Sequence, residues 1–291
     1  MIAAPTDRGR PAVTGAGTPP VRRRVEQIMG MPVSLALRGR HSDDDLARDA
    51  WAGAVEMLRH VDRVFSPYRD DSWIARLARG DVLLPDCPRE VADVLAIAET
   101  ARSESGGAFD VRRVGADGRP LLDPSGVVKG WAVSRAAALF ERLPETDVCL
   151  SAGGDMVCRS AAPDSPGWRI GIEDPADPAR TVAVVPVRNG AVATSGAVHR
   201  GAHITHGRTG VVPTRVASVT VLATDLTWAD IDATAAYALD GDALAWLRTR
   251  ADRRGLVAWS DGSTDLFDTM SSGHWLSALA ELVAGAEGGV G

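Results

Sequence analysis

The sequence has few cysteines, and their spacing argues against the usual cysteine-based sites. Among 291 residues there are three cysteines, an odd number that includes no C-x-x-C pair. This pattern indicates neither a disulfide framework nor a zinc ribbon. Cys149 and Cys158 lie in apolar or glycine-rich stretches, which favours core thiols over nucleophiles.

A long apolar run is also missing. No stretch reaches the roughly 18 apolar residues that a membrane-spanning helix needs, so we expect no stable membrane insertion. Residues 1–24 are rich in Pro, Gly, Thr and Arg and lack the apolar segment of a secretory signal. We expect these residues to form a disordered leader, and we expect the protein to be cytoplasmic.

Basic residues are not in excess. The formal net charge is -6, whereas a protein that binds nucleic acid needs a concentrated basic face. The chain is 45% hydrophobic and 24% charged, which is typical of a globular protein with a sizeable core. We expect no nucleic-acid partner, a single domain over residues 25–284, and a frayed tail over residues 285–291.

Apolar periodicity predicts an α+β fold. Alternating apolar residues indicate a first strand within 29–39, and Ser42 followed by three aspartates is typical of a helix start. A turn and a short helix are expected in 66–80, Pro88 is expected to open the next helix, and a further helix is expected to begin at Lys129 after a loop. Further short strands are expected in 147–154, 168–175, 181–194 and 217–224, helices in 228–240 and 241–252, and a last strand and helix after residue 255.

The segment TWADIDATAAYALD, residues 227–240, places polar side chains in an otherwise apolar helix. Asp230 and Thr234 are four residues apart, so they lie on one helical face. A carboxylate and a hydroxyl in this arrangement suit a hard cation such as Mg²⁺. Alternatively, Thr227-x-x-Asp230 is a capping box, in which Asp230 only binds backbone N–H groups at the helix start.

The segment LDPSGVVKGWAVSRAA, residues 122–137, is a second candidate. Asp123 precedes the small-residue turn Ser125-Gly126, where a ligand can approach the backbone closely. Lys129 follows near a helix start, which favours anions, so the segment could bind a phosphate or nucleotide. The alternative is a capped turn with a solvent-facing lysine. The spacing of a Walker A loop is absent.

Two glycine-rich segments complete the candidates. SAGGDM, residues 151–156, indicates a tight turn between strands. The loop 193–210 contains His199, His203 and His206, and a histidine there could act as a general base. The histidine spacing matches no common zinc site, and a solvated loop with incidental histidines is the alternative.

In order along the chain, segments between about residues 29 and 241 resemble those of one family, the FAD:protein FMN transferases of the ApbE family. The resembling segments are MGMPVS (29–34), FSPYRDDSWIARL (65–77), GGAFDV (106–111), LDPSGVVKGWAVSRA (122–136), SAGGDM (151–156), WRIGIEDP (168–175), ATSG (193–196), HITHGRTG (203–210) and VTVLATDLTWADIDATAAYALD (219–240).

The resemblance implies an α+β fold of ApbE-like (T-fold-like) type, in which helices pack on mixed or antiparallel sheets. It implies a transferase of a phosphorus-containing group that uses Mg²⁺. FMN would pass from FAD to a Thr or Ser of a target flavoprotein, and AMP would leave.

The resemblance also assigns site residues. Asp230 and Thr234 would be metal ligands, together with backbone carbonyl groups of Gly126 and Ala233. His203 matches the family's proposed base. The residues implied to contact FAD are Met29, Tyr68, Ala108, Phe109, Asp110, Asp123, Lys129, and Ile204 or Thr205.

Two other activities stay open. The same residues would serve hydrolysis as well as transfer, and one departure from the family pattern allows a protein without catalytic activity. His206-Gly207 stands where the family has Asp-Pro. The alternatives are an FAD pyrophosphatase, which would hydrolyse FAD to FMN and AMP, and a flavin-binding protein without catalytic activity.

Overall fold

One large antiparallel sheet organises the fold. The computed structural model describes residues 20–114, 120–198, 201 and 203–270. Eight strands form the sheet in the order β1-β2-β5-β6-β9-β10-β11-β12. Their bounds are β1 Arg22–Ile28, β2 Met31–Gly39, β5 Thr146–Ala152, β6 Asp155–Arg159, β9 Gly190–Gly196, β10 Val216–Ala223, β11 Arg254–Trp259 and β12 Thr264–Asp268.

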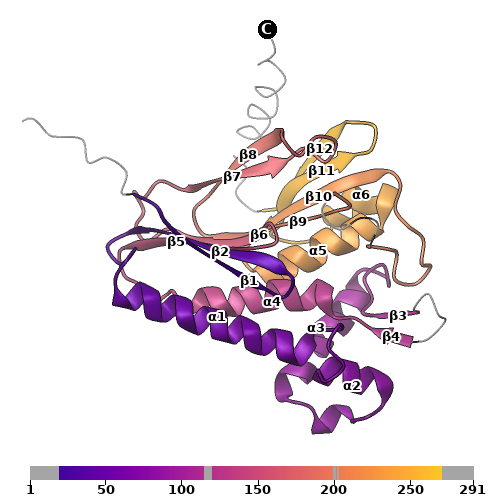
Figure 1. Ribbon diagram of the computed structural model, residues 1–291. Helices are drawn as coiled ribbons and strands as arrows, with labels where there is room; N and C mark the ends of the chain where they lie inside the picture. Colours follow the sequence, from indigo (N-terminus) through magenta and orange to yellow (C-terminus); the bar gives the residue numbers. More distant parts are fainter. Residues whose placement is uncertain (1–19, 115–119, 199–200, 202, 271–291) are drawn as a thin grey trace, which may run out of the picture.

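Two short hairpins stand apart from this sheet. In one, β3 (Arg112–Val114) pairs with β4 (Pro120–Leu122), and in the other β7 (Trp168–Glu173) pairs with β8 (Thr181–Val187). The β7–β8 hairpin lies over one face of the large sheet, as Figure 1 shows. Trp168, Ile170 and Ile172 alternate with exposed residues along β7, so they all point toward that face.

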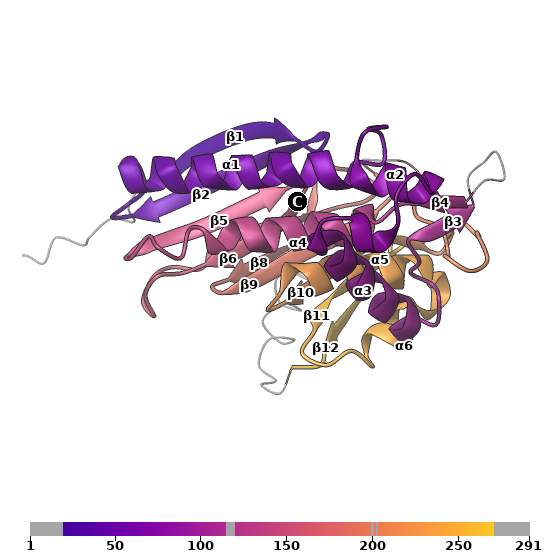
Figure 2. The same cartoon turned by 90° about the horizontal axis from the view of Figure 1, so that it is seen from below.

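The helices cover the opposite face of the sheet. Figure 2 shows α1, α4 and α5 lying across it. The helices are α1 Asp45–Phe65, α2 Trp73–Arg79, α3 Arg89–Glu104, α4 Ser125–Ala138, α5 Leu226–Ala238 and α6 Ala243–Leu247, with 3₁₀ turns at Leu84–Asp86 and Asp240–Asp242. The sheet therefore separates two cores: a helix-side core, and a smaller hairpin-side core beneath β7 and β8.

The α+β architecture with antiparallel sheets and packed helices is confirmed. In the part of the chain that the structure describes, no helix combines the length and apolarity that a membrane crossing requires. The cytoplasmic location and the single domain over 25–284 stay predictions. The tail 285–291 and the expected last helix lie outside the described residues.

Several boundaries differ from the expected ones. β1 begins at Arg22, so the predicted leader, 1–24, extends three residues too far. The first helix is capped by Asp44, whose side chain accepts a hydrogen bond from the Ala47 N–H, rather than by Ser42. α4 begins at Ser125, one turn before Lys129, and after α5 only a short helix, α6, forms within 241–252.

Helices α4 and α5 pack in close contact at Gly130. A Cβ atom at this position would lie 2.7 Å from the Leu226 carbonyl oxygen and 3.0 Å from the Thr227 Cα. These are backbone atoms, which cannot rotate away as a side chain can. The absence of a side chain at Gly130 therefore sets the distance between the two helices.

We predict that Gly130→Ala lowers the free energy of unfolding by about 1–3 kcal/mol, because the added methyl group forces α4 and α5 apart. Chemical denaturation measures the change. Gly53→Ala in α1 is the matched control: its Cβ would lie 3.6 Å from the Leu139 Cδ1, an ordinary contact. That substitution should raise stability by roughly 0.5–1 kcal/mol. Equal effects at both positions would contradict the close-packing argument.

Candidate functional site

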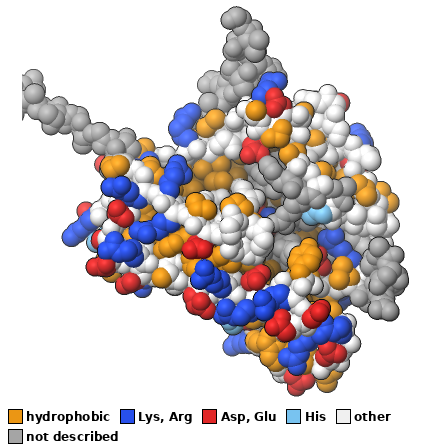
Figure 3. Space-filling model, viewed as in Figure 1, with side chains coloured by type: hydrophobic (Ala, Val, Ile, Leu, Met, Phe, Trp, Pro, Cys, Tyr) orange, Lys and Arg blue, Asp and Glu red, His pale blue; other side chains and the backbone are white. Residues whose placement is uncertain are grey.

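A cavity of about 700 Å³ opens between the sheet, the β7–β8 hairpin, the start of α4 and the middle of α5. Strand turns, the first turn of α4, the middle of α5 and the ends of β7, β9 and β10 contribute to its wall. In the space-filling view, hydrophobic side chains gather in a hollow below the hairpin (Figure 3). The volume is within the range of small-molecule binding sites.

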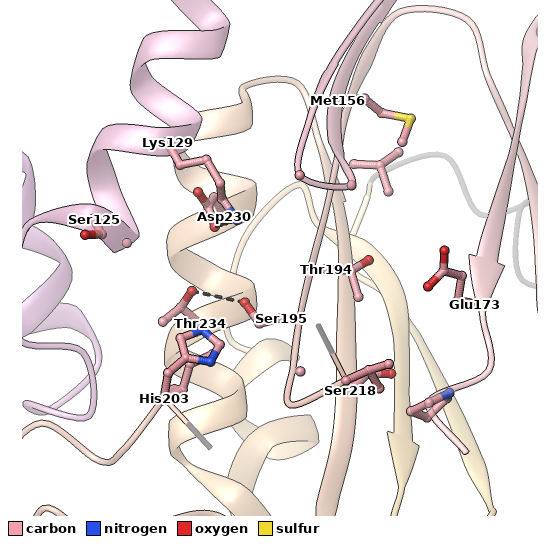
Figure 4. A pocket seen from close by; sticks show the side chains of 18 of the residues that line it. Ser125, Lys129, Met156, Glu173, Thr194, Ser195, His203, Ser218, Asp230 and Thr234 are labelled. Carbon is pink, nitrogen blue, oxygen red and sulfur yellow. Dashed lines mark hydrogen bonds and ion pairs between the residues drawn. The ribbon is translucent and has the colours of Figure 1, made fainter. Parts of the chain in front are cut away.

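A buried group of charges forms one wall of the cavity. The Lys129 ammonium of α4 makes an ion pair with Asp155 of β6 and lies 3.3 Å from the Asp230 Oδ1 of α5. Asp155 is 0% exposed and Asp230 is 2% exposed, whereas the Lys129 side chain is 17% exposed. Three elements that are distant in the sequence therefore meet through one lysine. Figure 4 shows the Lys129 and Asp230 side chains next to each other.

Backbone N–H groups hold both carboxylates in place. The Gly130 N–H donates to the Asp230 Oδ2 at 3.1 Å, and the Thr194 N–H donates to the Asp155 Oδ1 at 2.9 Å. Each carboxylate thus has a backbone donor and the shared lysine. Such partners are what a charge needs to remain in a protein interior.

The surroundings of Asp230 favour its protonated form. The pKa of Asp230 is raised to about 7. Burial is the largest cause and the nearby Asp155 also raises the pKa, whereas Lys129 and the Gly130 N–H lower it. With both carboxylates ionised, two negative charges face one lysine. A bound cation would balance the remaining charge and stabilise the ionised form of Asp230.

Two hydroxyl groups extend this wall. The Thr234 Oγ1, one helical turn after Asp230, lies 3.1 Å from the Ser195 Oγ of β9. Figure 4 shows this pair beside Asp230 and Lys129. Both residues line the cavity, so a carboxylate and two hydroxyl groups face the same space.

These oxygens fit Mg²⁺ but would not enclose it. Within the described ranges, no group of three or more His, Cys, Asp or Glu side chains is placed to hold a metal ion. Mg²⁺ commonly takes one or two carboxylates from the protein and completes its shell with water and substrate phosphates. Asp230, Thr234 and Ser195 supply such a partial set of hard donors.

The capping alternative for Asp230 is wrong. The N-cap of α5 is Asp225, whose Oδ1 accepts a hydrogen bond from the Trp228 N–H at 3.1 Å. Asp230 lies in the second turn of α5, and its backbone partner belongs to α4 instead. The Asp230 carboxylate thus faces Lys129 and the cavity, and it does not cap the helix.

Residues 122–137, the second candidate segment, show features of both interpretations: a capped turn at the helix start and a wall of the ligand cavity. The Asp123 Oδ1 accepts hydrogen bonds from the Ser125 N–H, at 3.0 Å, and from the Ser125 hydroxyl, so Asp123 does stabilise the start of α4. Lys129, however, is not solvent-facing. Gly126 lines the cavity, and a Cβ added there would lie 3.0 Å from the Phe109 ring. Phe109 thus supports this wall from behind.

His203 lies at the mouth of the cavity. Its Nδ1 is 2.9 Å from the Gly201 carbonyl oxygen, which can only accept a hydrogen bond. The neutral ring would therefore carry its proton on Nδ1 and leave Nε2 able to accept one. Ile204, the next residue, is buried and lines the wall, whereas His199 lies outside the described residues.

The replacement His206-Gly207 has a packing reason. The Gly207 N–H donates to the Ala108 carbonyl oxygen at 2.8 Å, and proline has no such N–H. A Cβ at Gly207 would also lie 2.7 Å from the Asp110 Cβ. Glycine at this position ties the histidine-containing loop to residues 108–110.

The structure brings most of the predicted site residues together. Those that line the cavity are Met29, Tyr68, Asp123, Gly126, Lys129, His203, Ile204, Asp230 and Thr234. Those that do not line it are Ala108, Phe109, Asp110, Thr205 and Ala233. Phe109 lies behind Gly126, and Ala233 is buried within α5.

Sequence reasoning missed several polar groups of the site. Asp155 was quoted only within a turn segment; the turn is confirmed, with positive φ angles at Gly153 and Gly154. Ser195, Glu173 and Ser218 line the cavity but were not selected, whereas Asp155 contributes through its ion pair with Lys129. Only Asp155 left a signal, as an acid that directly follows a glycine pair. The others became visible when β7, β9 and β10 were brought together.

The far side of the cavity is more apolar. Ile170 and Ile172 of β7 face Met156 of β6 and Val192 of β9. Ser218 of β10 is buried here, and its hydroxyl has no hydrogen-bond partner among the described residues. This side, which we call the hairpin compartment, can take a flat apolar group and offer it one hydroxyl.

Comparison with known proteins identifies a family. The profile of the ApbE family matches residues 29–116 and 114–257. Comparison with curated protein sequences gives no significant match. The sequence resemblance to this family is therefore confirmed by the profile.

Solved structures of the family share the fold. The ApbE protein from Thermotoga maritima is 19% identical, with a TM-score of 0.70 over 86% of this chain and 98% of that one. The flavin transferase ApbE from Vibrio cholerae is 20% identical, with a TM-score of 0.70 over 86% of this chain and 98% of that one. The flavinyl transferase ApbE from Pseudomonas stutzeri, in its apo form, is 18% identical, with a TM-score of 0.70 over 87% and 96%.

We predict that Asp230→Asn stabilises the ligand-free protein increasingly as pH rises from 4 to 8. The pKa of Asp230 is raised from 3.8 to about 7. The folded state thus holds its proton more tightly than the unfolded state, so wild-type stability falls as pH rises through this interval. At pH 8, the free energy of unfolding of the Asp230→Asn variant should exceed that of the wild type by about 2 kcal/mol.

Urea unfolding at the two pH values measures this difference. Asp225→Asn is the control, because that residue is exposed at the start of the same helix and asparagine also caps helices. It should change the free energy of unfolding by less than about 0.5 kcal/mol at both pH values. A pH-independent effect of Asp230→Asn would contradict the buried-charge interpretation.

Proposed function

The chain belongs to the ApbE family, and from this premise we propose that it is an FAD:protein FMN transferase. The proposed reaction moves FMN from FAD to a Thr or Ser hydroxyl of an acceptor flavoprotein and releases AMP. Two of the structural relatives are named as flavin transferases, which supports the proposal. The single observation that carries it is the Lys129–Asp155–Asp230 cluster on the wall of a cavity of about 700 Å³.

The cavity suits a dinucleotide because its two sides differ in chemistry. A pyrophosphate needs cations and donors, which the wall around Lys129 and the first turn of α4 can supply. A planar ring system needs apolar contacts, which Ile170 and Ile172 supply in the hairpin compartment. The unpartnered Ser218 hydroxyl would then find a partner on the ring or its sugar.

Mg²⁺ would be held by the Asp230 carboxylate and the Thr234 hydroxyl, with backbone carbonyl groups of Gly126 and Ala233. When bound, it would neutralise the charge of the pyrophosphate. Lys129 would remain paired with Asp155, and its ammonium group would stay on the wall that contacts the pyrophosphate. Asp155 is thus a positioning residue: it fixes the lysine through an ion pair and is itself fixed by the Thr194 N–H.

His203 would serve as the base. Its Nε2 would accept the proton of the acceptor hydroxyl as the oxygen attacks the FMN phosphorus. The bond from that phosphorus to the bridging oxygen breaks, and AMP leaves with the bridging oxygen. The position of His203 at the mouth of the cavity suits an acceptor that arrives as a side chain of another protein.

We predict that FAD, Mg²⁺ and a flavoprotein acceptor yield an acceptor that is heavier by one covalently bound FMN. Removing the metal with EDTA, or changing Asp230 to Asn, should lower the rate of adduct formation by about 100-fold or more. Intact-protein mass spectrometry measures the adduct, and added Mg²⁺ should restore the EDTA-treated wild type. Asp225→Asn should keep wild-type activity.

Product analysis separates transfer from hydrolysis. FMN and AMP formed from FAD without acceptor, at a rate that the acceptor does not change and without any adduct, would identify a pyrophosphatase. FAD that stays intact with Mg²⁺ and acceptor would identify a flavin-binding protein without activity. Either result would contradict the transferase assignment.

We predict that His203→Ala lowers kcat for transfer by about 100-fold or more, because a general base is lost. The dissociation constant for FAD should change less than about threefold, since removing a group that acts only in the transition state leaves ground-state binding intact. Single-turnover kinetics and fluorescence titration measure the two quantities. The control is His60→Ala, because that imidazole is half-exposed on α1 and pairs with Glu90. Unchanged turnover in the His203 variant would exclude this residue as the base.

A further inference from the structure

Two thiols face each other across neighbouring strands of the large sheet. Cys149 of β5 and Cys158 of β6 are directly paired in the antiparallel register, and their Sγ atoms are 3.7 Å apart. Both are free thiols. Neither lines the cavity, so the proposed transfer reaction does not use them.

The pair lies within a row of small side chains. Cross-strand partners run from Arg23 on β1 through Ala36 on β2 to Cys149, and from Cys158 to Gly190 on β9. Ala36 and Gly190 flank the two cysteines, so no bulky cross-strand neighbour keeps the sulfur atoms apart. The row faces the hairpin-side core: Ala36 and Cys158 belong to it, and Cys149 packs against it.

The two thiols differ in accessibility and acidity. Cys149 is partly exposed and Cys158 is buried. The Cys158 thiol donates a hydrogen bond to the Cys149 sulfur, which lowers the pKa of Cys149, and Arg23 lowers it further. Since the thiolate is the reactive form, Cys149 is the sulfur that a reagent from solution would meet first.

The strand geometry permits a bond between the two sulfur atoms. Directly opposed residues of antiparallel strands have Cα atoms about 4.5–5.5 Å apart. Disulfides form at Cα separations of about 4.4–6.8 Å, with an S–S distance of about 2.0 Å. The sulfur atoms, now 3.7 Å apart, can close the gap through side-chain rotation and a small approach of the strands.

We propose that Cys149 and Cys158 are a modification site that forms a reversible intramolecular disulfide by exchange with a small-molecule disulfide. The Cys149 thiolate attacks one sulfur of the reagent, and the first thiolate of the reagent leaves. Cys158 then loses its proton and attacks the Cys149 sulfur, and the second thiolate leaves. The protein loses two electrons and two protons, and the reagent is reduced to two thiols.

This site lies next to the hairpin compartment. Cys158 and Met156 are two residues apart on β6, so their side chains point to the same face of the sheet, and Met156 lines the cavity. Oxidation would thus link β5 to β6 beside the ligand site. The inference does not depend on flavin transfer, and its test needs no flavin.

Oxidised glutathione serves as the reagent, with the full-length wild-type protein. After incubation, the protein is unfolded in urea, remaining thiols are blocked with iodoacetamide, and the masses of tryptic peptides are measured. Both cysteines fall within residues 143–159, between Arg142 and Arg159, with no cleavage site inside. We expect this peptide to be unblocked and lighter than the dithiol peptide by two hydrogens, and dithiothreitol should restore two blockable thiols.

Single variants test the assigned roles. Cys158→Ser should stop the reaction at glutathione bound to Cys149, whereas Cys149→Ser should leave Cys158 free and blockable only after unfolding. Cys87→Ser, the control at the third cysteine, should leave the disulfide unchanged. Two blocked thiols in wild-type peptide 143–159, or glutathione that remains on Cys149 in the wild type, would overturn the proposal.

Discussion

The ion pairs of Lys129 with Asp155 and Asp230 are the contact on which the site depends. Each of these residues comes from a different element, and each is mostly removed from water. A buried charge without partners costs several kcal/mol, so the three residues constrain one another strongly. The lysine fixes α4 against α5 and β6, and the Thr194 and Gly130 N–H groups align the carboxylates. When both carboxylates are ionised, the same arrangement leaves an excess of negative charge at the cavity, where a cation can be held.

The close packing of α4 on α5 follows from this need. Lys129 must reach Asp230, and Gly130 allows that approach because it adds no side chain between the two backbones. The Gly130 N–H then donates to the same Asp230 carboxylate. One glycine thus serves helix packing and also binds a carboxylate oxygen. Lys129, the preceding residue, supplies the positive charge that faces Asp230. The two neighbours therefore act on the same carboxylate.

Much of the fold could be predicted because it rests on local patterns. Apolar periodicity located the long helix that ends near Phe65, and turn residues located the strands. The pairing of β6 with β9 could not be predicted, since it joins strands distant in the sequence. Asp230 and Thr234 were found from their helical spacing. Asp155 was not found, because its partner Lys129 is 26 positions away in the chain. Only the packing of α4 on the sheet brings the two residues together. Caps were also missed, since several acids near a helix start satisfy the same pattern.

The cavity needs both cores, and this explains its two chemistries. The helix-side core buries Asp230 and holds it rigidly, so that wall can carry charge at fixed positions. The hairpin-side core contributes Ile170 and Ile172 of β7, which also cover the sheet, together with Met156 and Val192 of the sheet itself. A two-stranded hairpin is marginally stable alone and is held by its apolar face. Its apolar side chains must therefore serve both stability and ligand contact. Polar groups are correspondingly few there: Ser218 belongs to the sheet below the hairpin, and Glu173 lies at the last position of β7.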